Sequence, residues 1–313
     1  MTKIALIGAG PMAQAYGHVL RHLDADCVVI GRGEASAAAF TKAVGLPVLT
    51  GGLDANRTLV DDCPHAIVAL PVPALAAQSV ALMDLGVRSL LVEKPAGMDA
   101  AEIESVAAKA DETGSSVYVA YNRRFYASVL EARRRIAADG GPTSFRFEIS
   151  EWSVRIGPSA QPDSVKSAWF LANSTHVADM AFFMGGFPTE IAGRTAGSTG
   201  WHDPAVFVGH GVADTGALFS YHADWNAAPR WMVEICTDGH TYMFQPLEGL
   251  KVRNKDGFAI EEIDCPGAAD DKTFKPGILR QVEAFLAPEP DPALLTIADQ
   301  LAHVRSVYQV MTA

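Results

Sequence analysis

Several features of common protein classes are scarce in this sequence. Only four of its 313 residues are cysteines, they form no C-x-x-C pair, and they stand at Cys27, Cys63, Cys236 and Cys265. This spacing favours reduced thiols in a cytosolic protein, so we expect a cytoplasmic location. No apolar run approaches the roughly 18 residues that a membrane span needs. The apolar stretch at the N-terminus is interrupted by Gly8, Gly10 and Pro11, which argues against a signal peptide.

Positive charge is also in short supply. The chain has 25 Lys and Arg against 36 Asp and Glu, a formal net charge of -11. This balance argues against nucleic acid or an anionic membrane as a partner. An anionic cofactor would have to be attracted by local hydrogen-bond donors. With 49% hydrophobic and only 19% charged residues, the chain has enough apolar side chains for one large or two medium domains.

Aromatic residues are nearly absent from the first third of the chain. Before Tyr118 the only ones are Tyr16 and Phe40, whereas all five tryptophans follow residue 150. An Ala/Val/Leu-rich segment is typical of a parallel sheet covered on both faces, and alternating aromatic and polar residues favour an antiparallel sheet. We therefore expect two domains, a first at 1–121 and a second at 122–313.

Short apolar strands alternate with helices in the first part. The predicted strands are 4–7, 27–30, 66–70, 90–92 and 117–120, and the predicted helices are 11–23, 34–44, 74–85 and 101–112. This alternation predicts a doubly wound α/β fold with a parallel sheet.

The second part has a different pattern. Its predicted strands are 144–152, 190–195, 215–225, 231–237 and 241–245, and its predicted helices are 174–184, 276–286 and 292–311. We expect an α+β domain built on a mostly antiparallel, open-faced sheet.

The first strand–helix junction carries the pattern Gly8-x-Gly10-x-x-Ala13. In the dinucleotide fingerprint the first glycine permits a sharp turn, the second lets the backbone approach a pyrophosphate, and the third small residue lets helix pack on strand. The anion then lies at the helix N-terminus. Pro11 donates no N–H, so the amides of Met12 and Ala13 would bind the pyrophosphate. The alternative is an ordinary tight turn.

The end of the second strand reads Gly31-Arg32-Gly33. An NAD site usually has a carboxylate there for the ribose, whereas a guanidinium can pair with a 2′-phosphate. We therefore expect NADP(H) as cofactor, with Gly31 and Arg32 in its site. In the alternative, Arg32 is a solvated loop charge, Glu34 binds the ribose, and the cofactor is NAD(H).

Two further motifs, "LLVEKPAG" at 90–97 and "YNRRF" at 121–125, follow predicted strands. Together with the glycine turn and "NSTHVADMAFF" at 173–183, they make the chain resemble the Gfo/Idh/MocA oxidoreductase family. The resemblance extends over essentially the whole chain and implies a Rossmann domain followed by a substrate domain. Members typically move a hydride between a nicotinamide and a carbinol or ketone carbon of a sugar or cyclitol.

The resemblance implies that Lys94 is catalytic, because an ammonium can stabilise or protonate the alkoxide formed at a reduced carbonyl. His176 matches the family's substrate-domain histidine, and Asp179 lies one helical turn further on, where it could orient the imidazole. Many members carry an aspartate four residues before this histidine, but here that position is Ala172. Asn173 or Ser174 could replace it in substrate binding.

The resemblance also places Asn122 and Arg123 near the cofactor or substrate, and we expect Glu93 and Asn122 at the cofactor and Arg123 at the substrate. Pro71 follows a strand end, where we expect it to shape the cofactor loop under the nicotinamide. The alternative for each is structural: a surface Lys94–Glu93 pair, a core His176, an arginine that fixes the domain junction, and a rigid turn at Pro71. The remaining histidines are scattered without metal-ligand spacing, so we expect no metal.

The sequence therefore predicts an NADP(H)-dependent oxidoreductase acting on a sugar, nucleotide-sugar or cyclitol-like substrate. Two alternatives stay open: a non-catalytic dinucleotide sensor of the same fold, and a reductase of another small ketone or a dihydrodiol. An open sheet face needs cover, so we also expect a homodimer or homotetramer.

Overall fold

The computed structural model describes residues 3–313. The chain divides into two compact units. Unit 1 comprises residues 1–122 and 272–302, and unit 2 comprises residues 123–271 and 303–313. The division after residue 122 lies close to the predicted one. However, 122–313 is not a single domain as predicted, because residues 272–302 return to unit 1.

Unit 1 is built on a seven-stranded sheet in the order β15-β6-β5-β4-β1-β2-β3. Its strands are β1 (Ile4–Ile7), β2 (Cys27–Ile30), β3 (Val48–Leu49), β4 (His65–Val68), β5 (Ser89–Glu93), β6 (Ser116–Ala120) and β15 (Leu295–Thr296). All neighbours are parallel except β15, which runs antiparallel to β6. The strand order reverses at β1, between β2 and β4, and such a switch point is where open α/β sheets bind ligands.

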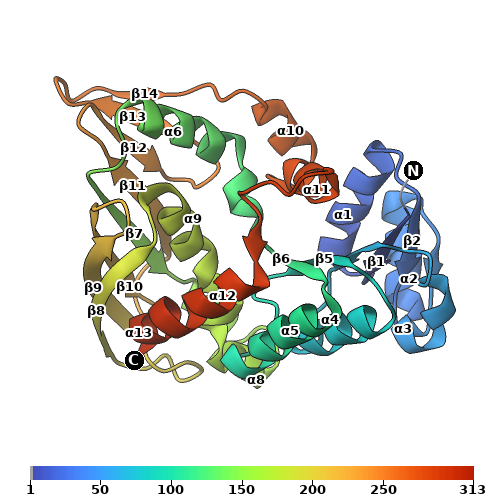
Figure 1. Cartoon of the computed structure of the whole chain (residues 1–313). Helices are drawn as coiled ribbons and strands as arrows, with labels where there is room; N and C mark the ends of the chain where they lie inside the picture. The colour runs from blue at the N-terminus through green and yellow to red at the C-terminus, as the bar shows by residue number, and fades with distance from the viewer. Residues whose placement is uncertain (1–2) are drawn as a thin grey trace. The chain divides into compact units, whose positions relative to one another are not determined.

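Helices cover this sheet on both faces. They are α1 (Pro11–His22), α2 (Glu34–Val44), α3 (Gly52–Ala55), α4 (Leu75–Asp84), α5 (Ala100–Thr113) and α11 (Ile278–Leu286), with short 3-10 turns at Arg57–Leu59, Val72–Ala74 and Asn122–Phe125. Figure 1 shows α1 with α11 on one face and α4 with α5 on the other. The predicted Rossmann domain is confirmed.

Unit 2 is built on an eight-stranded sheet in the order β14-β13-β12-β11-β7-β10-β9-β8. Its strands are β7 (Ser144–Ser150), β8 (Pro188–Ala196), β9 (Val206–Ala213), β10 (Leu218–Asp224), β11 (Arg230–Cys236), β12 (His240–Phe244), β13 (Lys251–Asn254) and β14 (Ile260–Glu262). Only the pair β7–β10 is parallel. The mostly antiparallel sheet is thus confirmed, although the sequence reading missed β9, β13 and β14.

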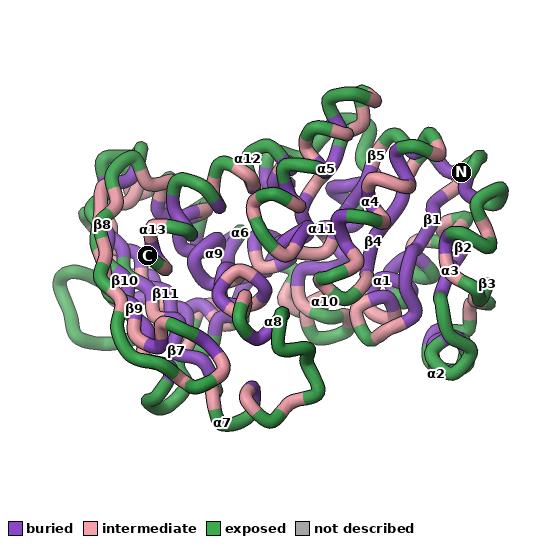
Figure 2. The backbone as a smooth tube through the Cα atoms, turned by 90° about the horizontal axis from the view of Figure 1, so that it is seen from below, coloured by how far each residue is buried: buried purple, intermediate pink, exposed green. Residues whose placement is uncertain are grey.

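The helical segments of unit 2 are α6 (Ala127–Ala138), α7 (Ser153–Ile156), α8 (Asp163–Ser167), a π-helix (Phe170–Ser174), α9 (Thr175–Gly185), a second π-helix (Val304–Tyr308) and α13 (Gln309–Thr312). The helices α10 (Ala268–Thr273) and α12 (Ile297–His303) cross the borders between the units. Phe182 of α9 packs edge-on against Phe145, Phe147 and Phe219 of the sheet. Figure 2 shows α9 almost wholly buried.

Two predicted helices begin later than expected. The segment 276–286 is helical only from Ile278, because Gly277 takes a positive φ of 76° in the preceding turn. The segment 292–311 is not one helix, because Leu295 and Thr296 pair with the backbone of Val119 and Tyr118 at the sheet edge. Pairing of an exposed strand edge outweighs the local helical pattern there. No helix among residues 3–313 is long and apolar enough to cross a membrane.

Candidate active site

The two glycines of the turn after β1 have different surroundings. Gly8 has φ +130°, and a Cβ at this position would overlap the carbonyl oxygen of Ala69 after β4. Gly10 is the N-cap of α1 in extended geometry, and a Cβ there would meet nothing within 4 Å. Gly8 is therefore needed by the protein itself, whereas the space above Gly10 is open for a ligand. An open cradle of backbone amides at a helix N-terminus fits a dinucleotide pyrophosphate.

The start of α1 supports this fit. Pro11 occupies the first helical position, and no side chain caps the helix start. The N–H groups of the first turn, including those of Met12 and Ala13, are thus the donors that an anion would use. Ala13 is completely buried, and its Cβ would lie 3.5 Å from a Cβ on Gly8. The first and third positions of the fingerprint therefore lie side by side.

The end of β2 lies at the same edge of the sheet as the glycine turn, because β1 and β2 are parallel neighbours. Gly31 donates its N–H to Leu49 at 2.8 Å, and a Cβ on Gly31 would meet Ala9 and Val48 at 3.0 Å. Arg32 follows with its side chain exposed, while its carbonyl accepts the N–H of Gly51. The backbone is thus fixed while the guanidinium projects outward.

Glu93 and Lys94 lie at the carboxyl end of β5. The hydroxyl of Tyr16, from the middle of α1, donates to Glu93 Oε1 at 2.8 Å and is hydrogen-bonded to Gln281 of α11 at 3.4 Å. Desolvation raises the pKa of Glu93, while the Tyr16 hydrogen bond and the ammonium groups of Lys94 and Lys275 act against this rise. Desolvation, followed by the nearby Glu93 charge, raises the pKa of Tyr16. Glu93 therefore connects the Lys94 turn to the helix that begins at the glycine turn.

Hydrogen bonds fix the turn after Lys94. Ala96 takes a positive φ of 75° and donates its N–H to the carbonyl of Glu93 at 3.0 Å. Gln300, which is fully buried, donates to the carbonyl of Pro95 at 3.2 Å and to the Tyr121 hydroxyl at 3.3 Å. A strained residue held by buried hydrogen bonds is typical of functional sites.

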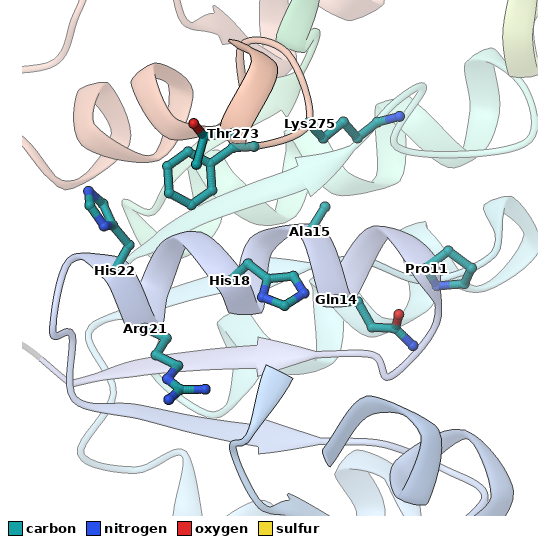
Figure 3. A pocket seen from close by; sticks show the side chains of 9 residues that line it. Pro11, Gln14, Ala15, His18, Arg21, His22, Thr273 and Lys275 are labelled. Carbon is teal, nitrogen blue, oxygen red and sulfur yellow. The ribbon is translucent and has the colours of Figure 1, made fainter. Parts of the chain in front are cut away.

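A groove of about 760 Å³ runs along α1. Figure 3 shows Ala15 and His22 of α1 pointing toward the segment 273–275, whereas Arg21 points to the other side of the helix. The lining residues are Pro11, Gln14, Ala15, His18, Arg21, His22, Thr273, Phe274 and Lys275. Lys275 shares this groove with Pro11 and lies close enough to Glu93 to lower its pKa. The sequence reading missed Tyr16, Gln281 and Lys275, because nothing in the local pattern indicates that they meet the end of β5.

Two predicted cofactor residues have clear structural contacts. Asn122 is 5% exposed, and its Nδ2 donates to the carbonyl of Pro276 at 2.9 Å, so it fixes the turn before α11. Pro71 is exposed after β4, and its carbonyl accepts the N–H of Ala74. Their cofactor contacts stay predictions, as does that of Glu93.

In unit 2, Asp179 forms a buried ion pair. Its two oxygens accept hydrogen bonds from Nε and Nη2 of Arg124 at 2.9 and 2.6 Å, and the carboxylate is 1% exposed. Desolvation raises the pKa of Asp179, and Arg124 opposes this effect. Both carboxylate oxygens of Asp179 are thus bonded to Arg124, and its predicted roles beside His176 and at the substrate stay predictions. Arg123 lies over the rings of Trp231 and Tyr126, 5.0 and 5.9 Å from their centroids.

The segment that carries His176 begins with the π-helix. Asn173 Nδ2 and Ser174 Oγ both donate to Glu151 Oε1, at 3.0 and 2.6 Å. The helix has the buried Ala172 where many family members carry an aspartate. The carboxylate that contacts this turn is that of Glu151, which follows β7. The sequence reading did not identify Glu151. Within residues 3–313, no group of three or more His, Cys, Asp and Glu side chains is arranged to hold a metal ion.

The parallel sheet, its glycine turn at the switch point and the open amide cradle define a dinucleotide-binding unit joined to a second, mixed α+β unit. Residues 2–121 match the model of the oxidoreductase family with an NAD-binding Rossmann fold. This match agrees with the Gfo/Idh/MocA resemblance that the motifs predicted, and it covers the first segment of unit 1.

One curated relative is the 4-carboxy-2-hydroxymuconate-6-semialdehyde dehydrogenase of a Sphingobium species. It is 26% identical over 190 residues, which are 59% of this chain and 59% of that protein.

Solved structures show the same fold over the whole chain. An NAD-binding oxidoreductase from Klebsiella pneumoniae has a TM-score of 0.78 at 17% identity, covering 100% of this chain and 97% of that one. A levoglucosan dehydrogenase in complex with NADH has a TM-score of 0.78 at 17% identity, covering 99% and 95%. The UDP-N-acetylglucosamine 3-dehydrogenase of Acidithiobacillus ferrooxidans has a TM-score of 0.74 at 14% identity, covering 99% and 96%.

Proposed function

We propose that the protein is an NADP(H)-dependent oxidoreductase that transfers a hydride between the nicotinamide and a carbinol or ketone carbon of a sugar, nucleotide-sugar or cyclitol-like substrate. The observation that carries this proposal is the pairing of the open Gly10 cradle with the fixed Lys94 turn at one edge of one sheet. Tyr16 links the two through its hydrogen bond to Glu93. The levoglucosan and UDP-N-acetylglucosamine dehydrogenases among the structural neighbours support the substrate class.

The choice of NADP(H) rests on Arg32. Its guanidinium projects from the end of β2, where the ribose of a bound dinucleotide lies in this fold. A guanidinium matches a phosphate in charge and geometry and offers two hydrogen bonds to it. NADH is the cofactor of the levoglucosan dehydrogenase neighbour, so NAD(H) is the competing assignment.

In the proposed reaction the nicotinamide supplies or accepts the hydride when it is bound. The ammonium of Lys94 stabilises the negative charge that develops on the substrate oxygen and donates a proton to it. In the oxidative direction Lys94 accepts that proton. His176 hydrogen-bonds the reacting oxygen and relays the proton.

A second candidate has support from the curated relative. That protein is a dehydrogenase of a carboxylated semialdehyde. An acid-bearing carbonyl compound is therefore the competing substrate class for this chain.

The test combines binding and turnover with one purified protein. Titration calorimetry with NADPH and NADH measures the cofactor preference, and nicotinamide absorbance measures turnover with sugars, cyclitols and carboxylated semialdehydes. We expect NADPH to bind more tightly and a polyol to be turned over. Absence of heat with both nucleotides would overturn the proposal. Tight binding without turnover of any substrate would favour the dinucleotide sensor.

Lys94 is tested separately. Lys94→Ala should lower kcat by about 100-fold or more, because the group that stabilises the alkoxide is lost, while the NADPH Kd changes less than about threefold. Lys255→Ala, an exposed lysine in unit 2, is the control and should leave kcat unchanged. Equal activity of Lys94→Ala and the wild type would exclude Lys94 as the catalytic group.

A further inference from the structure

Only two side chains make up the accessible strip of the segment around His176. Between Ala172 and Phe182, Asn173 and His176 are partly exposed, and every other residue is buried. Any ligand that approaches His176 along this segment therefore meets Asn173 as well.

A hydrogen bond to Glu151 orients the Asn173 side chain. The Glu151 residue is 5% exposed, and its Oε1 receives two hydrogen bonds, from Asn173 Nδ2 at 3.0 Å and Ser174 Oγ at 2.6 Å. Glu151 Oε1 is the acceptor in both hydrogen bonds. The Asn173 amide must therefore turn its NH₂ group toward Glu151, and it presents its carbonyl oxygen Oδ1 on the other side.

Asn173 and Ser174 are both part of the π-helix at Phe170–Ser174, and both side chains donate to Glu151 Oε1. Such π segments occur frequently at functional sites.

We propose that Asn173 Oδ1 accepts a hydrogen bond from a hydroxyl group of the substrate adjacent to the reacting carbon, and that Glu151 is the positioning residue that fixes this acceptor. The inference rests on the proposed function and narrows the substrate class to compounds with a hydroxyl group next to the reacting carbon. A carboxylate in place of that hydroxyl has no proton to donate to the Asn173 Oδ1 acceptor. The site therefore selects a vicinal polyol over a substrate with an acid group next to the reacting carbon.

Glu151→Gln is the decisive variant. A glutamine can donate as well as accept, so the Asn173 amide is free to turn and present either end. The wild type should prefer a polyol over its analogue deoxygenated beside the reacting carbon by at least about tenfold in kcat/KM. In Glu151→Gln this preference should fall below about threefold, while the NADPH Kd and the melting temperature stay near the wild-type values.

Glu148→Gln, in β7 three residues before Glu151 and hydrogen-bonded to Ser150, is the matched control and should keep the full preference. An unchanged preference in Glu151→Gln would overturn the inference. So would a wild type that turns over the deoxy or carboxylated analogue as well as the polyol.

A readout without turnover separates this inference from the proposed function. Calorimetry of the full chain with the polyol and its deoxy analogue measures the same preference as a ratio of Kd values. If no substrate is turned over but the polyol binds, and Glu151→Gln abolishes the preference, the inference stands and the oxidoreductase proposal falls. If no polyol in the panel binds the wild type, the inference falls.

Discussion

At the scale of single residues, Gly8 and Gly10 are two positions apart but lack a side chain for different physical reasons. Gly8 has a positive φ and lies against the Ala69 carbonyl, so its lack of a side chain is a condition of folding. Gly10 has backbone angles that any residue adopts, φ -80° and ψ -175°, and open space where a Cβ would be. Its lack of a side chain is therefore explained by a ligand that comes close to the backbone.

This contrast gives a paired prediction. Gly10→Ala should fold with a melting temperature close to that of the wild type but bind NADPH at least about tenfold more weakly, because the new methyl group fills the cradle. Gly8→Ala should instead destabilise the protein by about 1–3 kcal/mol or more through backbone strain and overlap. Thermal unfolding and calorimetry measure both effects. Unchanged NADPH binding in Gly10→Ala would contradict the placement of the pyrophosphate.

Arg32 carries a second prediction at this scale. Arg32→Ala should weaken NADPH binding by about 10- to 100-fold, which corresponds to the loss of a charge-assisted hydrogen bond to phosphate. NADH binding should change little, because NADH lacks the 2′-phosphate. Arg57→Ala is the control, since Arg57 is exposed and paired with Asp54 at 2.6 Å. Equal losses for both nucleotides would show that Arg32 does not read the 2′-phosphate.

At the scale of elements, α6 shows how a helix in unit 2 is fixed by charge. Glu131 is 7% exposed and accepts hydrogen bonds from Arg134 and Arg135, three and four residues further along the helix. The Arg134 hydrogen bond is the main cause that lowers the pKa of Glu131 to about 2. The folded state thus favours the ionised form more than the unfolded chain does. The stabilisation is fully present above the ordinary pKa of 4.5 and is lost as the pH falls toward 2.

Glu131→Gln should accordingly lower the free energy of unfolding at pH 7 by about 1 kcal/mol, a modest value because both arginines are partly exposed. The difference from the wild type should shrink between pH 5 and pH 2, where the wild type loses the same ionised group. Urea unfolding at a series of pH values measures it, with Glu248→Gln, an exposed glutamate, as control. A difference that stays constant down to pH 2 would contradict this account.

At the scale of the whole molecule, one face of the unit 2 sheet carries exposed side chains. Side chains of β10 alternate between exposed and buried, and α9 packs on the buried side. The exposed side includes Leu218 of β10 and Val208 of β9, which are 61% and 41% exposed. Apolar side chains on an open sheet face favour association with a second copy of the chain. We propose a homodimer or homotetramer that uses this face.

Sedimentation at micromolar concentration tests the assembly. The wild type should sediment as a dimer or tetramer, and Leu218→Asp should shift it toward the monomer, because a buried unpaired carboxylate is costly. Phe258→Asp is the control, since Phe258 is 96% exposed and lies outside the sheet strands. A wild type that sediments only as a monomer would contradict the proposal.

The sequence alone determined the features that depend on neighbouring residues. Strand–helix alternation, the glycine fingerprint after the first strand and the motif at Glu93–Lys94 predicted the unit 1 sheet and the position of its candidate site. Alternating aromatic residues predicted the antiparallel sheet of unit 2. Such patterns are readable because period, turn geometry and helix starts are set within a few residues.

Only the tertiary structure decided which distant residues meet. Tyr16 reaches Glu93 across 77 positions, and Glu151 reaches Asn173 and Ser174 across 22 and 23. Residues 272–302 return to unit 1 because β15 pairs with the edge of β6 and α11 packs beside α1. These contacts form because buried polar groups and open strand edges need partners. Where along the chain a partner is found depends on the three-dimensional packing and leaves no trace in the local sequence.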